Sequence, residues 1–265
     1  MTKESVSPAC TLSHVIFLSE AECLHLLLFF SERMIMGQHT LFDVFAYLCA
    51  ELLASGITFT KDGYPIFPEH IMLGCNPNDI SEMIDWRNRN KAENPANTII
   101  VMYLDDEFLY RRLFRLKQDL PEYKRFLAVA GFDLSPRIGM DPELQRFNIT
   151  LGMMATIWLG LHGVRIIPNW RIGDQSTLPA LNAYPRNAMF AVGTLGCSHG
   201  TKQDKDYGEI MLRTKVLITD PQLLLIYGPL LEQNRMLMDK LGIPYKLWRE
   251  YRHRSYAATQ IGKVA

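Results

Sequence analysis

The chain has 265 residues, of which 48% are hydrophobic and 21% are charged, and these ordinary values exclude a disordered or low-complexity protein. Its 28 basic and 28 acidic residues give a formal net charge of +0, so nucleic-acid or membrane binding would need a local patch. Five cysteines without a CxxC pair indicate neither a disulfide framework nor a zinc ribbon. The cysteine usage favours a reduced, cytoplasmic protein, and no apolar run approaches the roughly 20 residues that span a bilayer, so we expect no membrane contact.

Helical spacing of apolar residues characterises the start of the chain. Ser19 is a suitable N-cap for a helix that extends to about Met34. A second helix is predicted from Thr40 to Ser55, where Gly56 suits a left-handed C-cap. We therefore predict an N-terminal helical segment over residues 1–56.

Residues 57–97 are rich in turn-forming residues. The turn Lys61-Asp62-Gly63 predicts a short hairpin. A long polar loop then follows around one short helix, predicted from Ile80 to Trp86. The loop portion, residues 74–97, is the predicted domain boundary or lid.

From Thr98 onward, short apolar runs of strand length alternate with longer amphipathic stretches. The predicted strands cover 99–104, 126–132, 164–167, 189–192, 223–227 and 245–248. The predicted helices cover 107–117, 142–161, 177–184, 207–219 and 230–241. Continuous apolar strands separated by helices are typical of a parallel sheet covered by helices, so residues 98–265 are predicted to form an α/β domain of βα repeats.

The positions of polar residues favour one arrangement of these repeats. Such residues follow every predicted strand, whereas an open sheet gathers its ligand contacts at one switch point. We expect a (β/α) barrel or partial barrel, with an open doubly wound sheet as the alternative.

The strand ends also supply the candidate site, because the carboxyl ends of parallel strands meet at one rim. Asp133 and Asp174 are the candidate catalytic carboxylates, as acid/base groups or as metal ligands. Arg171 is the candidate anion clamp. Two structural interpretations compete with these roles: the carboxylates could cap helices, and Arg171 could form a structural ion pair with Asp174.

Further candidates for substrate binding share this strand-end position. The complete predicted set is Asn169, Arg171, Gly193, Thr194, Cys197 and Tyr227. The glycines near 193 allow close backbone approach to an anion, although the spacings of dinucleotide and P-loop motifs are absent. Cys197 is a candidate nucleophile with His199 nearby, or an inert small hydrophobe. The histidines form no metal-binding pair, and an oxygen-ligand site would have to combine Asp105, Asp133 and Asp174 from separate strands, so no metal site is predicted. The sequence leaves the cofactor open.

Several of these residues also carry a resemblance. They are Phe132-Asp133 with Ser135, Ile166-Ile167-Pro168-Asn169 with Arg171 and Gly173-Asp174, Ala191-Val192-Gly193-Thr194 with Gly196-Cys197, and Ile226-Tyr227-Gly228. Over about residues 98–248 the chain resembles the family known as domain of unknown function 4417, which is found in bacteria, phages and other mobile elements. An aromatic residue often precedes the Gly-Asp pair in that family, where this chain has Ile172. The resemblance implies a shared site at the strand ends and a mobile-element origin, but no established activity.

Two functions follow from the sequence. The first is an enzyme or binding domain for a small anionic or polar molecule, which predicts that Asp133, Asn169, Arg171, Asp174, Thr194 and Tyr227 line one cavity. The alternative is an accessory protein that binds nucleic acid or a host protein. It would use the basic loop 87–91 and a basic, aromatic tail that contains Arg249, Arg252 and Arg254.

Overall fold

The computed structural model describes residues 40–74, 76–194 and 202–249. The helix predicted from Ser19, Cys197 of the candidate site, and Arg252 and Arg254 of the tail lie outside these residues. None of the described helices is both long and apolar enough to cross a membrane.

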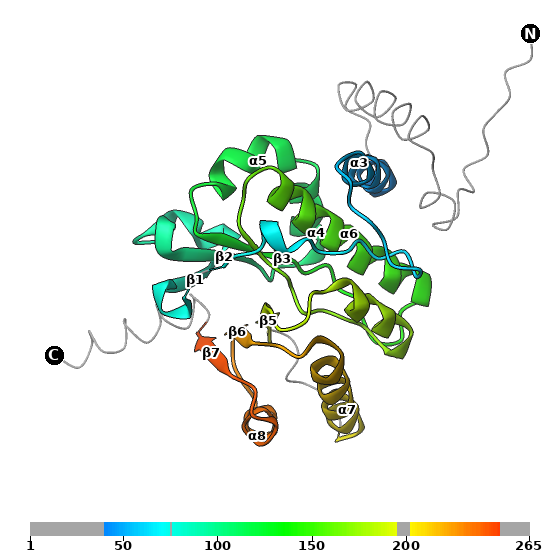
Figure 1. The fold of residues 1–265 in the computed structure, drawn as a ribbon, viewed down its shortest axis with the longest axis vertical. Coiled ribbons are helices and arrows are strands. Elements are labelled where there is room, and N and C mark those ends of the chain that lie inside the picture. The colour runs from blue at the N-terminus through cyan, green and yellow to red at the C-terminus, as the bar shows by residue number, and fades with distance from the viewer. Residues whose placement is uncertain (1–39, 75, 195–201, 250–265) are drawn as a thin grey trace, which may run out of the picture.

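The first described helix, α3 (Leu41–Ala54), has the bounds that its end signals predict. Thr40 and Asp43 form a reciprocal capping box, in which the Asp43 backbone N–H donates to Thr40 Oγ1 at 3.3 Å and the Thr40 N–H donates to Asp43 Oδ2 at 2.8 Å. Gly56 has a φ of +79° just beyond the helix, as a left-handed end requires. The helix packs on α6 (Pro142–Leu161), and Figure 1 shows the two side by side.

The hairpin predicted near residue 62 is reduced to one antiparallel bridge between Phe59 and Pro65. Short 3₁₀ helices follow at Glu69–Ile71, Pro77–Asp79, Trp86–Lys91 and Pro95–Asn97.

The predicted helix from Ile80 to Trp86 is wrong, because this segment contains the strand β1 (Glu82–Asp85). Met83 and Ile84 point to opposite sides of the strand, and both are fully buried. A strand buried on both faces has no alternating pattern, so its periodicity cannot be distinguished from that of a short buried helix. The partner strand decides the conformation, since Met83 pairs with Ile99 in a parallel ladder.

The strands form two parallel sheets. The first contains β1, β2 (Thr98–Met102), β3 (Ala128–Phe132) and β4 (Ile166–Ile167) in that order. The second contains β5 (Met189–Gly193), β6 (Leu223–Tyr227) and β7 (Tyr245–Trp248) in that order.

One parallel bridge, between Asn169 and Ala191, connects the two sheets. The expected parallel α/β class is therefore confirmed, and in neither sheet does the strand order reverse as it would in a doubly wound fold. Over residues 40–74, 76–194 and 202–249 no ladder joins β7 to β1, so closure into a barrel stays a prediction.

Helices follow most strands, as expected. They are α4 (Asp106–Leu113), α5 (Leu116–Tyr123), α6, α7 (Lys202–Thr219) and α8 (Glu232–Leu241). In Figure 1, α5 and α6 lie on one side of the sheets, and α7 and α8 lie on the other. The helix predicted over 177–184 is a 3₁₀ helix, Gln175–Ala183, and α5 was not predicted because Pro121 lies inside it.

Successive side chains along the strands point to opposite faces of the sheets, and the two faces pack into two different apolar clusters. Ile100 and Met102 of β2 join the larger cluster beneath α3 and α6. Ile99, Val101 and Tyr103 face a second cluster to which every strand contributes. This inner cluster contains Tyr103 and Tyr227 at the carboxyl ends of their strands, which brings both phenols to the rim where the predicted site lies.

Candidate functional site

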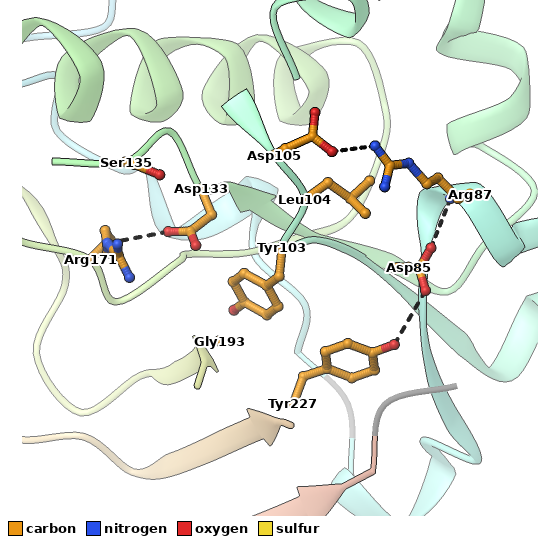
Figure 2. Close-up of a pocket in the computed structure, with 10 residues that line it drawn as sticks. All are labelled: Asp85, Arg87, Tyr103, Leu104, Asp105, Asp133, Ser135, Arg171, Gly193 and Tyr227. Atoms are coloured by element: carbon orange, nitrogen blue, oxygen red, sulfur yellow. Dashed lines mark hydrogen bonds and ion pairs between the residues drawn. The ribbon is translucent and has the colours of Figure 1, made fainter. Parts of the chain in front are cut away.

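A cavity of about 280 Å³ opens at the carboxyl ends of β1 to β6 (Figure 2). Its lining residues are Asp85, Arg87, Tyr103, Leu104, Asp105, Asp133, Ser135, Arg171, Gly193 and Tyr227. Each of them is the last residue of a strand or comes within a few positions after it. Because parallel strands end at a common edge, segments far apart in the sequence supply one site.

One side of the cavity is formed by Asp133 after β3 and Arg171 after β4. Arg171 Nε lies 3.5 Å from Asp133 Oδ1, and Asn169 Nδ2 donates to the same oxygen at 2.8 Å. The backbone oxygen of Asn169 in turn accepts a hydrogen bond from the Tyr184 hydroxyl at 2.8 Å. The Asp133 side chain is 15% exposed and that of Arg171 is 29% exposed, so both side chains reach the cavity. Asn169, on the protein side of the pair, fixes the orientation of the Asp133 carboxylate.

The opposite side is formed by Asp85 at the end of β1 and Asp105 after β2. Asp85 is buried, and its Oδ1 accepts the backbone N–H groups of Arg87 and Asn88. The Tyr227 hydroxyl donates to Asp85 Oδ2 at 3.4 Å. The Arg87 guanidinium pairs with Asp105 at the more exposed edge of the cavity.

Asp105 also has a structural task, because it is the N-cap of α4. The backbone N–H of Phe108 donates to Asp105 Oδ1 at 3.0 Å. This bond, together with the bond from Arg87, holds the pKa of the Asp105 carboxyl below its ordinary value. Asp105 is therefore ionised at neutral pH.

Tyr103 lies in the cavity between the two Arg–Asp pairs, and its ring is near that of Tyr227, with 6.2 Å between the centroids. Burial raises the pKa of the Tyr103 hydroxyl well above its usual value of 10, and the nearby Asp133 carboxylate adds to the rise. Tyr103 therefore stays protonated and acts as a hydrogen-bond donor at physiological pH.

The structure brings together four of the predicted catalytic and substrate-binding residues, since Asp133, Arg171, Gly193 and Tyr227 line the cavity. Ser135, which belongs to one of the motifs shared with the family, lines it as well. Asn169 lies behind Asp133 and lines a smaller cavity of about 10 Å³. Thr194 continues the pairing of β5 with β6, since its backbone N–H donates to the Tyr227 carbonyl at 3.1 Å.

Asp174 is not brought to the cavity. Its carboxylate caps the 3₁₀ helix that begins at Gln175, where Oδ1 accepts from the Ser176 backbone N–H at 3.0 Å. Gln145 Nε2 donates to its other oxygen at 2.6 Å. The Ser176 hydroxyl also donates to Oδ1, at 2.5 Å, and this bond, followed by the bond from Gln145, holds the pKa of Asp174 below its ordinary value. The cap interpretation therefore accounts for Asp174, and the ion pair of Arg171 is made with Asp133.

Sequence reasoning missed Asp85 and Tyr103 as site residues, and it assigned Arg87 to the alternative nucleic-acid loop and not to the cavity. Asp85 is missed because the sequence pattern predicts a short helix where the structure has β1. A signal for Tyr103 does exist, since it is in phase with Ile99 and Val101 on the inner face of β2.

The donors and acceptors of the cavity suit a polar ligand. Three aspartates and two arginines line it, which gives a formal charge of −1. In the part of the chain that the structure describes, no group of three or more His, Cys, Asp or Glu side chains could hold a metal ion. The available chemistry is hydrogen bonding by the guanidinium, phenol and carboxylate groups, with Asp133 able to accept a proton.

Comparison with known proteins identifies the region that contains this cavity. A family model for a domain of unknown function, DUF4417, matches residues 72–251. The match begins before the expected start near Thr98, so it includes β1 with Asp85 and Arg87. No curated protein and no solved structure matches the chain.

Proposed function

The chain belongs to the DUF4417 family, a domain of unknown function, and from this premise we propose that it binds a small polar ligand at the carboxyl ends of its parallel strands. The observation that carries the proposal is the convergence of side chains from six successive strands on one cavity. Parallel α/β folds bind their ligands at this edge.

The charges of the cavity restrict the ligand. Arg171 and Arg87 donate hydrogen bonds in a planar fork that suits carboxylate and other acceptor groups. Three carboxylates offset these two arginines, which disfavours a polyanion. The volume of about 280 Å³ is at the small end of ligand sites, so the ligand is the size of a simple metabolite.

If the domain is an enzyme, the same geometry assigns the roles. Asp133 is the candidate proton acceptor, because it faces the cavity and is oriented by Asn169. Arg171 would stabilise negative charge that develops on the ligand. Asp174 has no part in this proposal, since its hydrogen bonds are local to its helix cap and to Gln145.

Ligand-induced thermal stabilisation tests the proposal. Wild-type protein is screened against amino acids, carboxamides, sugars, nucleosides and monophosphates, alongside Asp133→Asn and Arg171→Ala. Arg186→Ala is the matched control, because Arg186 pairs with Asp220 at the same 3.5 Å distance but both side chains are exposed. We expect compounds that raise the Tm of the wild type and of Arg186→Ala without raising that of either cavity variant. Equal stabilisation of all four proteins would place the binding site elsewhere, and a screen with no stabilising compound would contradict the proposal.

Nucleic-acid binding is the second candidate, and one cluster of the described residues favours it. The guanidinium groups of Arg87, Arg111 and Arg112 lie 4.6, 6.0 and 5.4 Å from the centroid of the Phe108 ring. Each of these arginines also pairs with an acidic side chain, which weakens the attraction that the cluster offers to phosphate. The mobile-element setting and the cytoplasmic location expected from the sequence remain part of the proposal and do not distinguish the two candidates.

A further inference from the structure

The Tyr103 hydroxyl is a buried polar group without a hydrogen-bond partner among the described residues. Tyr103 is only 6% exposed, and Figure 2 shows its hydroxyl on the side of the cavity that faces Arg171. Leaving a hydroxyl buried and unpaired costs stability, so most buried hydroxyls have partners.

The neighbouring buried tyrosines behave differently. The Tyr184 hydroxyl donates to the Asn169 backbone oxygen at 2.8 Å, and the Tyr227 hydroxyl donates to Asp85 at 3.4 Å. Tyr103 therefore differs from both of these neighbours in offering an unused donor to the cavity.

We propose that the Tyr103 hydroxyl donates a hydrogen bond to a carbonyl or carboxylate oxygen of the ligand, beside Arg171, while Asp133 accepts an N–H from the same ligand. This inference rests on the proposed function and names the chemical class of the ligand. The class comprises small molecules in which an oxygen acceptor and a nitrogen donor are close together, as in an amino acid or a carboxamide.

The spacing and the hydrogen-bonding capacity of the three side chains support this class. Arg171 Nε lies 3.5 Å from Asp133 Oδ1, so one ligand group can contact both side chains. Within the described chain both contacts of Asp133 are made by Oδ1, which leaves the acceptor capacity of Oδ2 for a ligand donor. The phenol and the guanidinium can donate and Asp133 can accept, so a ligand with an oxygen acceptor beside an N–H donor complements all three side chains. The formal charge of −1 on the lining favours a zwitterion or a neutral amide over a phosphate dianion.

Thermal melts without ligand test the first step. Tyr103→Phe removes the unpaired hydroxyl, so its Tm should equal or exceed that of the wild type. Tyr184→Phe is the matched contrast, because it leaves the Asn169 carbonyl without its donor and should lower the Tm. Tyr123→Phe is the control for loss of an unpaired hydroxyl outside the cavity. The Tyr123 hydroxyl is also buried without a hydrogen-bond partner among the described residues, but Tyr123 does not line the cavity. A fall in Tm for Tyr103→Phe comparable with that of Tyr184→Phe would show that the protein itself uses the hydroxyl, and this would overturn the inference.

Binding measurements test the second step, with the twenty common L-amino acids and their carboxamides as probes and saturation-transfer NMR as the readout. We expect at least one probe to bind the wild type, to bind Tyr123→Phe equally, and to bind Tyr103→Phe roughly tenfold more weakly. Preferential binding of the free acids would identify the ligand oxygen as that of a carboxylate, and preferential binding of the carboxamides would identify it as that of an amide carbonyl.

The outcomes separate this inference from the proposed function. Unchanged affinity of Tyr103→Phe, or no binding of either probe class to the wild type, overturns the inference. The proposed function stands in both cases if a compound of another class stabilises the wild type but not Arg171→Ala or Asp133→Asn.

Discussion

Gly193 lies directly against the ring of Tyr103. A Cβ atom added at Gly193 would lie 2.5 Å from Tyr103 Cδ1 and 2.7 Å from Cγ, which is closer than side-chain contacts allow. The carboxyl end of β5 and the inner face of β2 can therefore meet only because residue 193 has no side chain. This contact gives the strand-end glycine a steric role as well as the anion-binding role expected from the sequence.

Replacement of Gly193 by alanine should displace the Tyr103 ring and lower the free energy of unfolding by about 1 to 3 kcal/mol, as overpacking of a core does. Ligand binding should weaken with it, because the ring lines the cavity. Gly208→Ala in α7 is the control, since a Cβ there meets nothing within 4 Å. Chemical denaturation of the two variants measures the difference, and equal stabilities would contradict the proposed contact.

The Arg171–Asp133 pair should contribute more stability than an exposed pair of the same length. Arg171→Ala leaves the Asp133 carboxylate, which is 15% exposed, without its cation, and should cost about 1 to 3 kcal/mol. Breaking the Arg186–Asp220 pair, whose side chains are 64% and 68% exposed, should cost less than about 1 kcal/mol. Double-mutant cycles on both pairs provide the measurement. A coupling energy for Arg171–Asp133 no larger than that for the exposed pair would show that solvent screens it equally.

Asp174 should matter for stability and not for ligand binding. Asp174→Ala removes a helix cap and should cost about 0.5 to 2 kcal/mol at neutral pH, with unchanged affinity for any ligand of the cavity. A loss of ligand binding by Asp174→Ala without a loss of stability would instead support the catalytic role that the sequence suggested for Asp174.

The contribution of Asp174 should also depend on pH. The folded-state pKa lies below the ordinary 3.8, so the stabilisation is complete above pH 3.8 and is lost as the pH falls through the lower folded value. The difference in unfolding free energy between wild type and Asp174→Ala should therefore be constant near neutrality and shrink in strong acid. Urea unfolding over a pH series measures this difference, and a difference that grows in acid would contradict the assigned hydrogen bonds.

Binding of single-stranded DNA should be weak and sensitive to salt, because the chain has a formal charge of +0. Reversal of Arg249, Arg252 and Arg254 to glutamate should abolish it if the tail provides the contacts. Filter binding over a salt series measures both effects. Tight binding that persists at high salt, or in the reversed variant, would place the interface elsewhere on the protein.

Much of the secondary structure could be predicted because its signals are local. The capping box of Thr40 and the positive φ of Gly56 depend on a few adjacent residues, and the predicted ends, Thr40 and Ser55, are the two cap residues of α3. β6 was also predicted with its observed bounds, because five consecutive apolar residues are followed by a glycine. β1 could not be predicted in the same way, since the ladder with β2 decides its conformation.

The sequence by itself determined the parallel α/β class and the edge of the sheets at which polar side chains would gather. Both follow from the order of apolar and polar residues along the chain. Only the tertiary structure decided which of those side chains meet. Asp133 is paired with Arg171 instead of being grouped with Asp174, because Gln145 of α6 and the cap at Ser176 hold Asp174 away from the cavity. The contacts of Asp133 with Arg171 and of Gln145 with Asp174 join residues far apart in the chain, so they form only when the strands and helices pack together.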